Sequence, residues 1–566
     1  MLLETFQPAT DPLGAPWLSA LVAALPVVAM LVTLGGLRWK AHHAGPFSWL
    51  LAFVVAVTAF GMPWTMALST SVHGFVYGIF PIIWILVTAI WMYEVTVTAG
   101  RFDDLRRTFF LISDDPRVLG LLIAFCFGGL LEALAGFGAP VAITAAMLVA
   151  IGFSPLRSAL IALLANTVPV AFGAVGLPVL MAAKSGGFDD VLAISPITGR
   201  MTAILCLVVP ILLLSVMDGK RGIKECWPFG LVVGISFGVT KWIASATALY
   251  SLTEVFAAVI SVAVAIVFLK LWHPRGGAEA TGRIGAVLDE SVDGTGTVAP
   301  VNADAADVPP LTASKITMAL VPYLLVIVVF GIAALPPVKA ALGATDLKFS
   351  WPLLGDLLDV AGNPSAHQNY TLAWASTPGI LLAFVAIATG LIYRLTLPQV
   401  FAVLWTNVKK MRFAMLTIGS VVALAYVMGD SGQTLALGMF FAGAGLAYPF
   451  VAPVLGWIGT YVTGSDTSAN ILFSGLQSGV GAEIGPGSHL AVEDMQALLV
   501  GANAAGGVVG KMISPQSLTI AATAIGAPGS ESVILRRIIG WSFILLFLLC
   551  LLSGLMSTLV LSWLLP

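Results

Sequence analysis

Polar side chains gather in one short stretch of an otherwise apolar region near the C-terminus. Within the eight residues 463–470, six carry an oxygen or an amide group: Thr463, Ser465, Asp466, Thr467, Ser468 and Asn470. Free backbone amides at the start of a helix carry partial positive charge and suit a carboxylate, and the hydroxyl and amide groups beside them suit a 2-hydroxyl group. We therefore predict that four of these residues contact substrate, against the alternative that they only cap broken helices: Thr463, Ser465, Ser468 and Asn470.

The first half of the chain offers a second set of candidate binding residues. Gly136 and Gly138 permit a tight turn, and the polar pair Asn166 and Thr167 lies just before Pro169, where a helix is expected to break. We predict that these two glycines and the Asn-Thr pair also line the binding site.

Lys511 lies well inside an apolar segment, in the stretch GKMISPQS. A charge at that depth costs about 2.5–3.5 kcal/mol and needs a partner. We predict that it pairs with a substrate carboxylate; the alternative is a structural ion pair with Asp466 or Glu132. Ser514 and Gln516 follow it and either bind substrate or cap the break.

Three acids are candidates for carrying a proton, because each is expected to be buried: Asp466 first, Glu132 second and Glu94 third. An acid that moves a proton needs surroundings that change between the loaded and empty states, and an acid near Lys511 has that opportunity. Asp430 is instead expected to be a solvated cap at the end of its span.

Other chemistries find no support in the sequence. The four cysteines lack metal-ligand spacing, and no zinc, phosphate-binding or nucleophile motif is present, so we expect no metal, no cofactor and no enzyme activity. Of 566 residues, 59% are hydrophobic and 10% charged, whereas a soluble domain has about a quarter charged residues. Nothing indicates a nucleic-acid partner, and the oligomeric state is left open.

These residues must be positioned by helices in a lipid bilayer, because apolar runs of about twenty residues recur along the whole chain. We predict an all-α integral membrane protein with about twelve crossings. Full spans are expected at 17–37, 47–62, 73–98, 200–217, 228–240, 254–271, 315–333, 372–393, 413–429 and 535–565. Two further crossings, 155–183 and 494–525, are interrupted by proline and glycine.

Two segments, 118–152 and 449–480, are predicted to be re-entrant hairpins. Their first arms have about fourteen residues, roughly 21 Å of helix, which is less than the hydrocarbon core of roughly 30 Å. Lys and Arg clusters place alternate loops in the cytoplasm and both termini outside. The two hairpins are then entered from opposite sides.

The chain is therefore predicted to contain an inverted repeat. Residues 1–271 form the first copy, with helices 228–271 as an extra pair; 272–314 is a flexible cytoplasmic linker, and 315–566 is the second copy. Opposed hairpins and broken helices are typical of secondary carriers with a binding site at the membrane midplane.

Five stretches carry a resemblance to a known family. They read LLEALAGFGAPVAITAA at 130–146, ANTVPVAFGAVGLPVL at 165–180, MDGKRGIKECWP at 217–228, GWIGTYVTGSDTSANILFSGLQ at 456–477 and GKMISPQSLTIA at 510–521. With them the sequence resembles the bacterial L-lactate permease family. The resemblance implies symport of lactate with a proton across the bacterial inner membrane, with D-lactate and glycolate as further substrates.

The resemblance leaves one alternative, a sodium-coupled carboxylate carrier of the same fold. A carrier of dicarboxylates should show more than one buried cation, and Lys511 is the one convincing case in the sequence. Sodium-coupled relatives in the wider group of inverted-repeat transporters carry Ser-Asn-Thr motifs. Here the matching positions read Ser-Asp-Thr at 465–467 and Ala-Asn-Thr at 165–167. This departure, together with Lys511, favours protons over sodium.

Overall fold

The computed structural model describes residues 5–37, 39–109, 112–134, 136, 138–284, 312–359 and 362–566. Helices make up most of the described structure, and its two strands form one short antiparallel pair, β1 (Leu347–Ser350) with β2 (Asn369–Leu372). Among the described residues, ten helices are long and apolar enough to cross a membrane, or eleven if one bent pair counts as a span. The predicted class, a multi-pass helical membrane protein, is confirmed.

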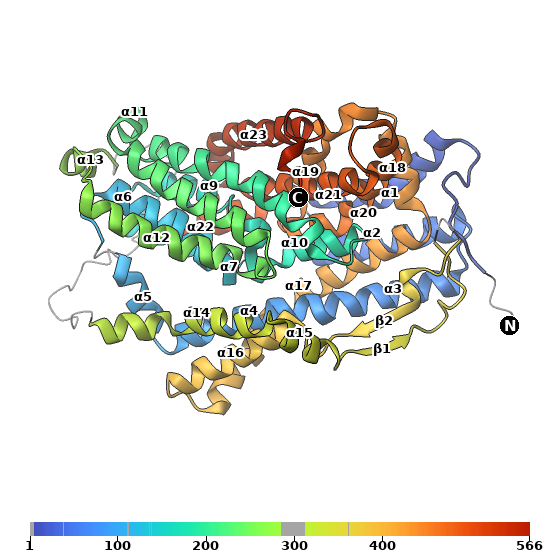
Figure 1. Ribbon diagram of the computed structural model, residues 1–566, viewed down its shortest axis with the longest axis horizontal. Helices are drawn as coiled ribbons and strands as arrows, with labels where there is room; N and C mark the ends of the chain where they lie inside the picture. Colours follow the sequence, from blue (N-terminus) through green and yellow to red (C-terminus); the bar gives the residue numbers. More distant parts are fainter. Residues whose placement is uncertain are drawn as a thin grey trace.

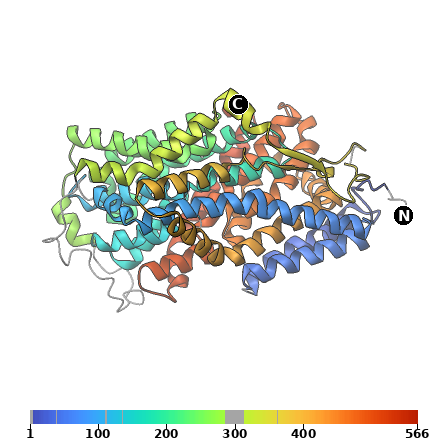
Figure 2. The same cartoon turned by 90° about the horizontal axis from the view of Figure 1, so that it is seen from below.

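One group of helices is long and faces outward along one side of the molecule. Helix α17 packs against α2, α3 and α4, and α16 packs against α4 and α14. Figure 1 shows α3, α4, α14, α16 and α17 in the lower half of the molecule, and in Figure 2 the blue α3–α4 segment runs along the molecule. Their bounds are α2 Ala41–Thr58, α3 Trp64–Tyr77, α4 Trp84–Thr98, α14 Ala313–Ala333, α16 Pro378–Ile392 and α17 Leu397–Asp430. We call these six helices the outer group.

The other group contains the predicted hairpins and broken helices. The first hairpin is α6 to α7 (Pro116–Leu134) with α8 (Ala139–Ala150), and the second is α19 (Ala452–Thr463) with α20 (Asp466–Ile484). The broken helices are α9 (Pro155–Ala165) with α10 (Gly173–Ser185), and α21 (Val492–Lys511) with α22 (Pro515–Ala524). Helix α10 packs on α20 and α22 packs on α8, so each broken helix contacts the hairpin from the other half of the chain. We call these elements the inner group.

Burial separates the two groups. In the apolar windows of Pro116–Leu134 and Val492–Ala524, every residue is buried inside the protein, whereas only 28% is buried in α14. Helices without lipid-facing residues have no need of an all-apolar surface, so polar side chains are tolerated there when they find partners.

The length expected for the first hairpin arm was wrong. Pro116–Leu134 is one helical run of 19 residues, about 28 Å long, because π-helical turns at Leu122–Phe127 carry the helix through without a stop. The first arm of the second hairpin, α19, has 12 residues and remains too short to cross. Arm length alone therefore supports re-entrance only for the second hairpin.

The two spans expected at 200–217 and 228–240 are present as two helices that share the single label α11 (Ser195–Ser245). The chain turns back at Asp218 and Gly219, which have non-helical backbone angles. The two helices run antiparallel, with Gly234 against Cys206 and Gly199 against Ser245. The part after the break packs against α12 (Thr253–Leu271). These are the two extra helices expected between the halves.

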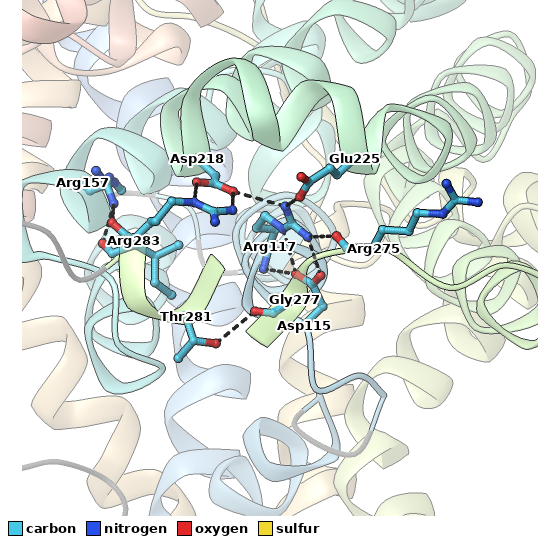
Figure 3. A network of polar contacts seen from close by, with 10 residues as sticks. Asp115, Arg117, Arg157, Asp218, Glu225, Arg275, Gly277, Thr281 and Arg283 are labelled. Carbon is cyan, nitrogen blue, oxygen red and sulfur yellow. Dashed lines mark hydrogen bonds and ion pairs between the residues drawn. The ribbon is translucent and has the colours of Figure 1, made fainter. Parts of the chain in front are cut away.

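Part of the expected flexible linker is ordered. Helix α13 (Gly277–Ile284) packs against α6 and α11, where Arg283 pairs with Asp218 at 2.7 Å, and Arg157 donates to the carbonyl of Arg283 at 2.9 Å. In Figure 3 these groups surround the buried Arg117, which pairs with Asp115 at 2.8 Å. Hydrogen bonding to Asp218 raises the pKa of Arg283. The rest of the predicted linker, 285–311, lies outside the described residues.

Asp430 is not the solvated cap that was expected. It is buried at the end of α17, accepts a hydrogen bond from Thr70 at 3.1 Å and lies 2.8 Å from His367 Nδ1. Burial alone would lower the pKa of His367, but the Asp430 carboxylate outweighs burial and raises it above 6.5. The segment that carries His367 and β2 is thus fastened to α3 and α17.

Candidate functional site

A small cavity of about 20 Å³ lies where the two hairpin tips meet the broken helices. A void of this size holds about one or two water molecules, so a three-carbon acid requires the tips to separate. Its lining comes from both halves of the chain: Glu132, Gly136, Val170, Gly173, Ala174, Pro178, Gly464, Ser465, Asp466, Thr467 and Lys511.

The strongest contact in this cavity is an ion pair between the halves. Lys511 ends α21, Glu132 lies in the last turn of α7, and Lys511 Nζ is 2.6 Å from Glu132 Oε1. The two side chains are 8% and 3% exposed, which leaves them nearly free of water. Glu132 Oε2 is buried and has no hydrogen-bond partner among the described residues.

Asp466 is the first residue of α20, where unpaired amides favour a negative charge. Its Oδ1 accepts from Thr460 at 3.4 Å, while Oδ2 is buried without a hydrogen-bond partner in the described part of the chain. Gly507 on α21 makes the room for this carboxylate, because a Cβ at Gly507 would collide with Asp466 Oδ1. Thr460 and Gly507 were both missed from the sequence.

Five of the predicted residues line the cavity: Glu132, Gly136, Ser465, Asp466 and Lys511. Ser465 also caps α20, because its hydroxyl oxygen accepts from the Ser468 amide at 3.2 Å. This residue therefore both caps a helix and lines the cavity. Around it, the turn at Gly464 has a left-handed backbone with φ of 72°, a conformation that glycine adopts without strain.

The other predicted binding residues surround the cavity without lining it. Thr463 donates to the carbonyl of Gly459 at 2.7 Å, and Ser514 caps α22. Gln516 is exposed and lies against Gly464, and Gly138 lies against Ile520 on the same helix α22. Both hairpin tips therefore contact α22.

Asn470 belongs to a buried amide network and not to the cavity lining. Its Nδ2 donates to the carbonyl of Pro178 at 3.2 Å, and its Oδ1 accepts from Asn503 at 3.0 Å. Asn166 and Thr167 are buried at the break after α9, and Thr167 donates to the carbonyl of Leu163 at 3.4 Å. These polar residues hold the broken elements together.

Glu94 is not the deeply buried acid that the sequence suggested. It lies on α4 in the outer group, its side chain is 30% exposed, and Lys410 approaches it at 3.5 Å. Glu94 therefore lies outside the cavity, and only Asp466 and Glu132 of the three candidate acids are brought together.

The break in the first broken helix is longer than the four residues expected. After Asn166–Pro169 the chain continues through a short turn at Val170–Phe172, and Ala174 and Val175 have positive φ of 44° and 59°. Such angles are strained for residues with a side chain. The glycines at 173 and 176 were the signal for this longer break, and both Gly173 and Ala174 line the cavity.

Buried cations other than Lys511 were also missed from the sequence. Lys511 was expected to be the one convincing case, but Lys241 on α11 is fully buried and paired with Glu254. The number of buried cations therefore does not exclude a dicarboxylate substrate.

Comparison with known proteins agrees with the helical architecture. The family model described as L-lactate permease matches residues 19–560. The chain belongs to the L-lactate permease family. L-lactate permeases of Escherichia coli (strain K12) and Bacillus subtilis (strain 168) are 34% and 36% identical, over 100% and 97% of both chains. The glycolate permease GlcA of Escherichia coli (strain K12) is 38% identical over 94% of both chains.

Among solved structures, the YdaH transporter of Alcanivorax borkumensis covers 83% of this chain and 84% of its own, with 15% identity and a TM-score of 0.36. Membership of a permease family and the ten apolar helices identify a multi-pass membrane transporter of small molecules.

Proposed function

We propose that this permease takes up L-lactate, and also D-lactate and glycolate, together with a proton across the bacterial inner membrane. The observation that carries the proposal is the buried cation of Lys511 at the meeting point of both hairpin tips, held by Glu132 and close to a second acid. A buried ammonium in a small cavity recognises a short monocarboxylate. The glycolate permease among its relatives supports glycolate as a substrate.

Binding requires a change of partner at Lys511. The Lys511 ammonium pairs with Glu132 at 2.6 Å, so an incoming carboxylate has to compete with the Glu132 carboxylate. The first amides of α20 and the hydroxyl of Ser465 lie in the same cavity and suit the other oxygens of a 2-hydroxy acid. A proton on an acid of the site reduces the competition.

Charge balance favours one proton for each lactate. With Glu132 and Asp466 ionised and Lys511 protonated, the three groups sum to one negative charge. A lactate anion and a proton added together leave that sum unchanged, whereas lactate alone would double it in a site shielded from water. Asp466 suits the proton best, because Glu132 is already paired with Lys511 at 2.6 Å, whereas Asp466 forms no ion pair with any of the described residues.

Sodium coupling is disfavoured for a different reason, because a sodium ion would satisfy the charge balance as well as a proton does. A sodium ion in this cavity would lie beside the fixed ammonium of Lys511, and metal ions of this kind prefer several oxygen ligands without a neighbouring cation. In addition, the Glu132 carboxylate is already paired with Lys511.

The architecture fits transport by an inverted repeat, with residues 1–271 and 315–566 as the two copies. Each hairpin packs on the broken helix of the other copy, α8 with α22 and α20 with α10, as a two-fold relation requires. We place the basic ends in the cytoplasm and both termini outside. The inner group then moves relative to the outer group to expose the cavity to each side in turn.

The test is uptake of labelled L-lactate by purified permease in proteoliposomes. An imposed gradient with an alkaline interior should drive accumulation without sodium, and unlabelled glycolate and D-lactate should compete. Uptake that needs sodium at a fixed pH would reject proton coupling. No uptake of any of the three acids would reject the substrate assignment.

A further inference from the structure

A second buried ion pair lies outside the cavity, and substrate binding as proposed does not use it. Lys241 on α11 and Glu254 in the first turn of α12 lie 2.5 Å apart, and both side chains are 0% exposed. Neither residue lines the cavity. Replacing a buried ion pair by apolar residues is often neutral or stabilising, so stability alone is a poor reason for this pair.

Lys241 also holds the break in the first broken helix. Its ammonium donates to the carbonyl of Val168 at 2.7 Å and lies 5.3 Å from the centre of the Phe172 ring. Carbonyls at a helix end lose their partners within the helix, and a cation near an aromatic face is attracted to it. One ammonium thus contacts residues near both ends of the unwound segment.

The other side of the same segment contacts Glu132. Gly173 follows Phe172 directly and is so close to Glu132 that a Cβ there would lie 2.9 Å from Oε1. Oε1 is the oxygen that pairs with Lys511. The unwound segment 168–173 therefore lies between two buried ion pairs. One is Lys241 with Glu254, and the other, on the side of the cavity, is Glu132 with Lys511.

We propose that Lys241 and Glu254 are positioning residues for the substrate site: they fix the unwound segment 168–173 and, through Gly173, the carboxylate of Glu132. The second broken helix has no need of such a pair, because Lys511 is part of that helix itself. The proposal rests on the proposed function for its transport readout, but the ordering of 168–173 can be measured without any substrate.

The experiment compares two changes with one control. Lys241→Met with Glu254→Leu removes both charges, and Lys241→Glu with Glu254→Lys keeps an ion pair but moves the ammonium to the other helix. The matched control is Ser236→Ala with Ser261→Ala, which removes a 3.1 Å hydrogen bond between the same two helices, away from the break. All are purified in detergent and reconstituted.

Both charge variants should raise the KM for lactate about tenfold, since a tenfold change is 1.4 kcal/mol of binding, and should change the maximal rate less. Hydrogen exchange of the amides of 168–173 should be faster in both, and the control should match the parent protein. Unchanged exchange together with unchanged KM in either charge variant would overturn the proposal. If the parent protein carries no lactate, the proposed function fails, and the exchange measurement alone decides the positioning role.

Discussion

Gly507 carries no side chain, and that absence leaves the space that Asp466 occupies. We expect Gly507→Ala to force the Asp466 carboxylate out of position, because overpacking a tight interior costs about 1–3 kcal/mol. Lactate uptake should be lost while most of the protein still reaches the membrane. Gly540→Ala is the control, since a Cβ there meets nothing within 4 Å; equal uptake by the two variants would contradict the assignment.

Variants of Lys511 test whether this residue binds substrate or only forms a structural ion pair. Lys511→Ala leaves the Glu132 carboxylate buried without its cation, and breaking such a pair costs about 3–5 kcal/mol. We expect a lower melting temperature in detergent, restored when Glu132→Ala is added. Lactate binding, followed by calorimetry, should be lost in both variants. If the double variant binds lactate with the affinity of the parent protein, Lys511 is structural only.

At the scale of single residues, sequence reasoning located Lys511, Glu132 and Asp466, because charges in apolar segments are rare enough to be noticed. It misplaced Glu94 and overlooked Lys241 for a common reason. Whether a side chain on a helix is buried depends on which neighbouring helix covers that face. A single sequence does not state which helices are neighbours.

At the scale of elements, the pair between His367 and Asp430 joins the outer segment to α17 and depends on pH. The pKa of His367 is raised by folding, so the stabilising contribution is fully present below about pH 6.5. It is lost as the pH rises through the higher value of the folded protein. The melting temperature of His367→Asn should therefore fall furthest below that of the parent protein at about pH 6 and approach it at about pH 9.

The exposed His489 provides the control for this comparison. His489→Asn should follow the parent protein at every pH. A difference between His367→Asn and the parent protein that stays constant from acid to alkaline pH would show that the His367 contact does not depend on its charge.

Sequence reasoning at this scale predicted two hairpins and two breaks, because glycine, proline and polar clusters interrupt apolar runs at those places, and helices do end at each of them. It shortened the first hairpin arm and ended the first break too early. The π-helical turns at Leu122–Phe127 and the strained angles at Ala174 and Val175 are both maintained by surrounding structure, and local propensity gives no sign of either.

At the scale of the whole molecule, a second cavity of about 270 Å³ lies between the two groups. Val422 of α17 and Met181 of α10 both line it. If the inner group moves as a unit, a thiol-specific bifunctional reagent that joins cysteines at these positions should stop uptake, and a cleavable reagent should allow recovery. The four native cysteines are replaced beforehand.

The comparison pair joins two elements of the inner group, through Ser478→Cys and Gln496→Cys, whose side chains lie 3.1 Å apart in the parent protein. Cross-linking this pair should leave uptake intact. Because α10 belongs to no hairpin, uptake that persists after joining Met181→Cys to Val422→Cys would indicate local opening of a hairpin tip instead of movement of the unit.

The ion pairs Lys241–Glu254 and Glu132–Lys511 also differ in the time that separates the synthesis of their two members. Lys241 and Glu254 are separated by 13 positions, whereas Glu132 and Lys511 are separated by 379. At about 5–20 residues per second, the ribosome needs roughly 20–75 s to pass from one member of the second pair to the other. Before Lys511 is synthesised, the first half of the chain already contains both Lys241 and Glu254. Glu132 is then in the membrane without its lysine partner. A nascent permease whose synthesis stops before α21 therefore contains Glu132 without its ion-pair partner.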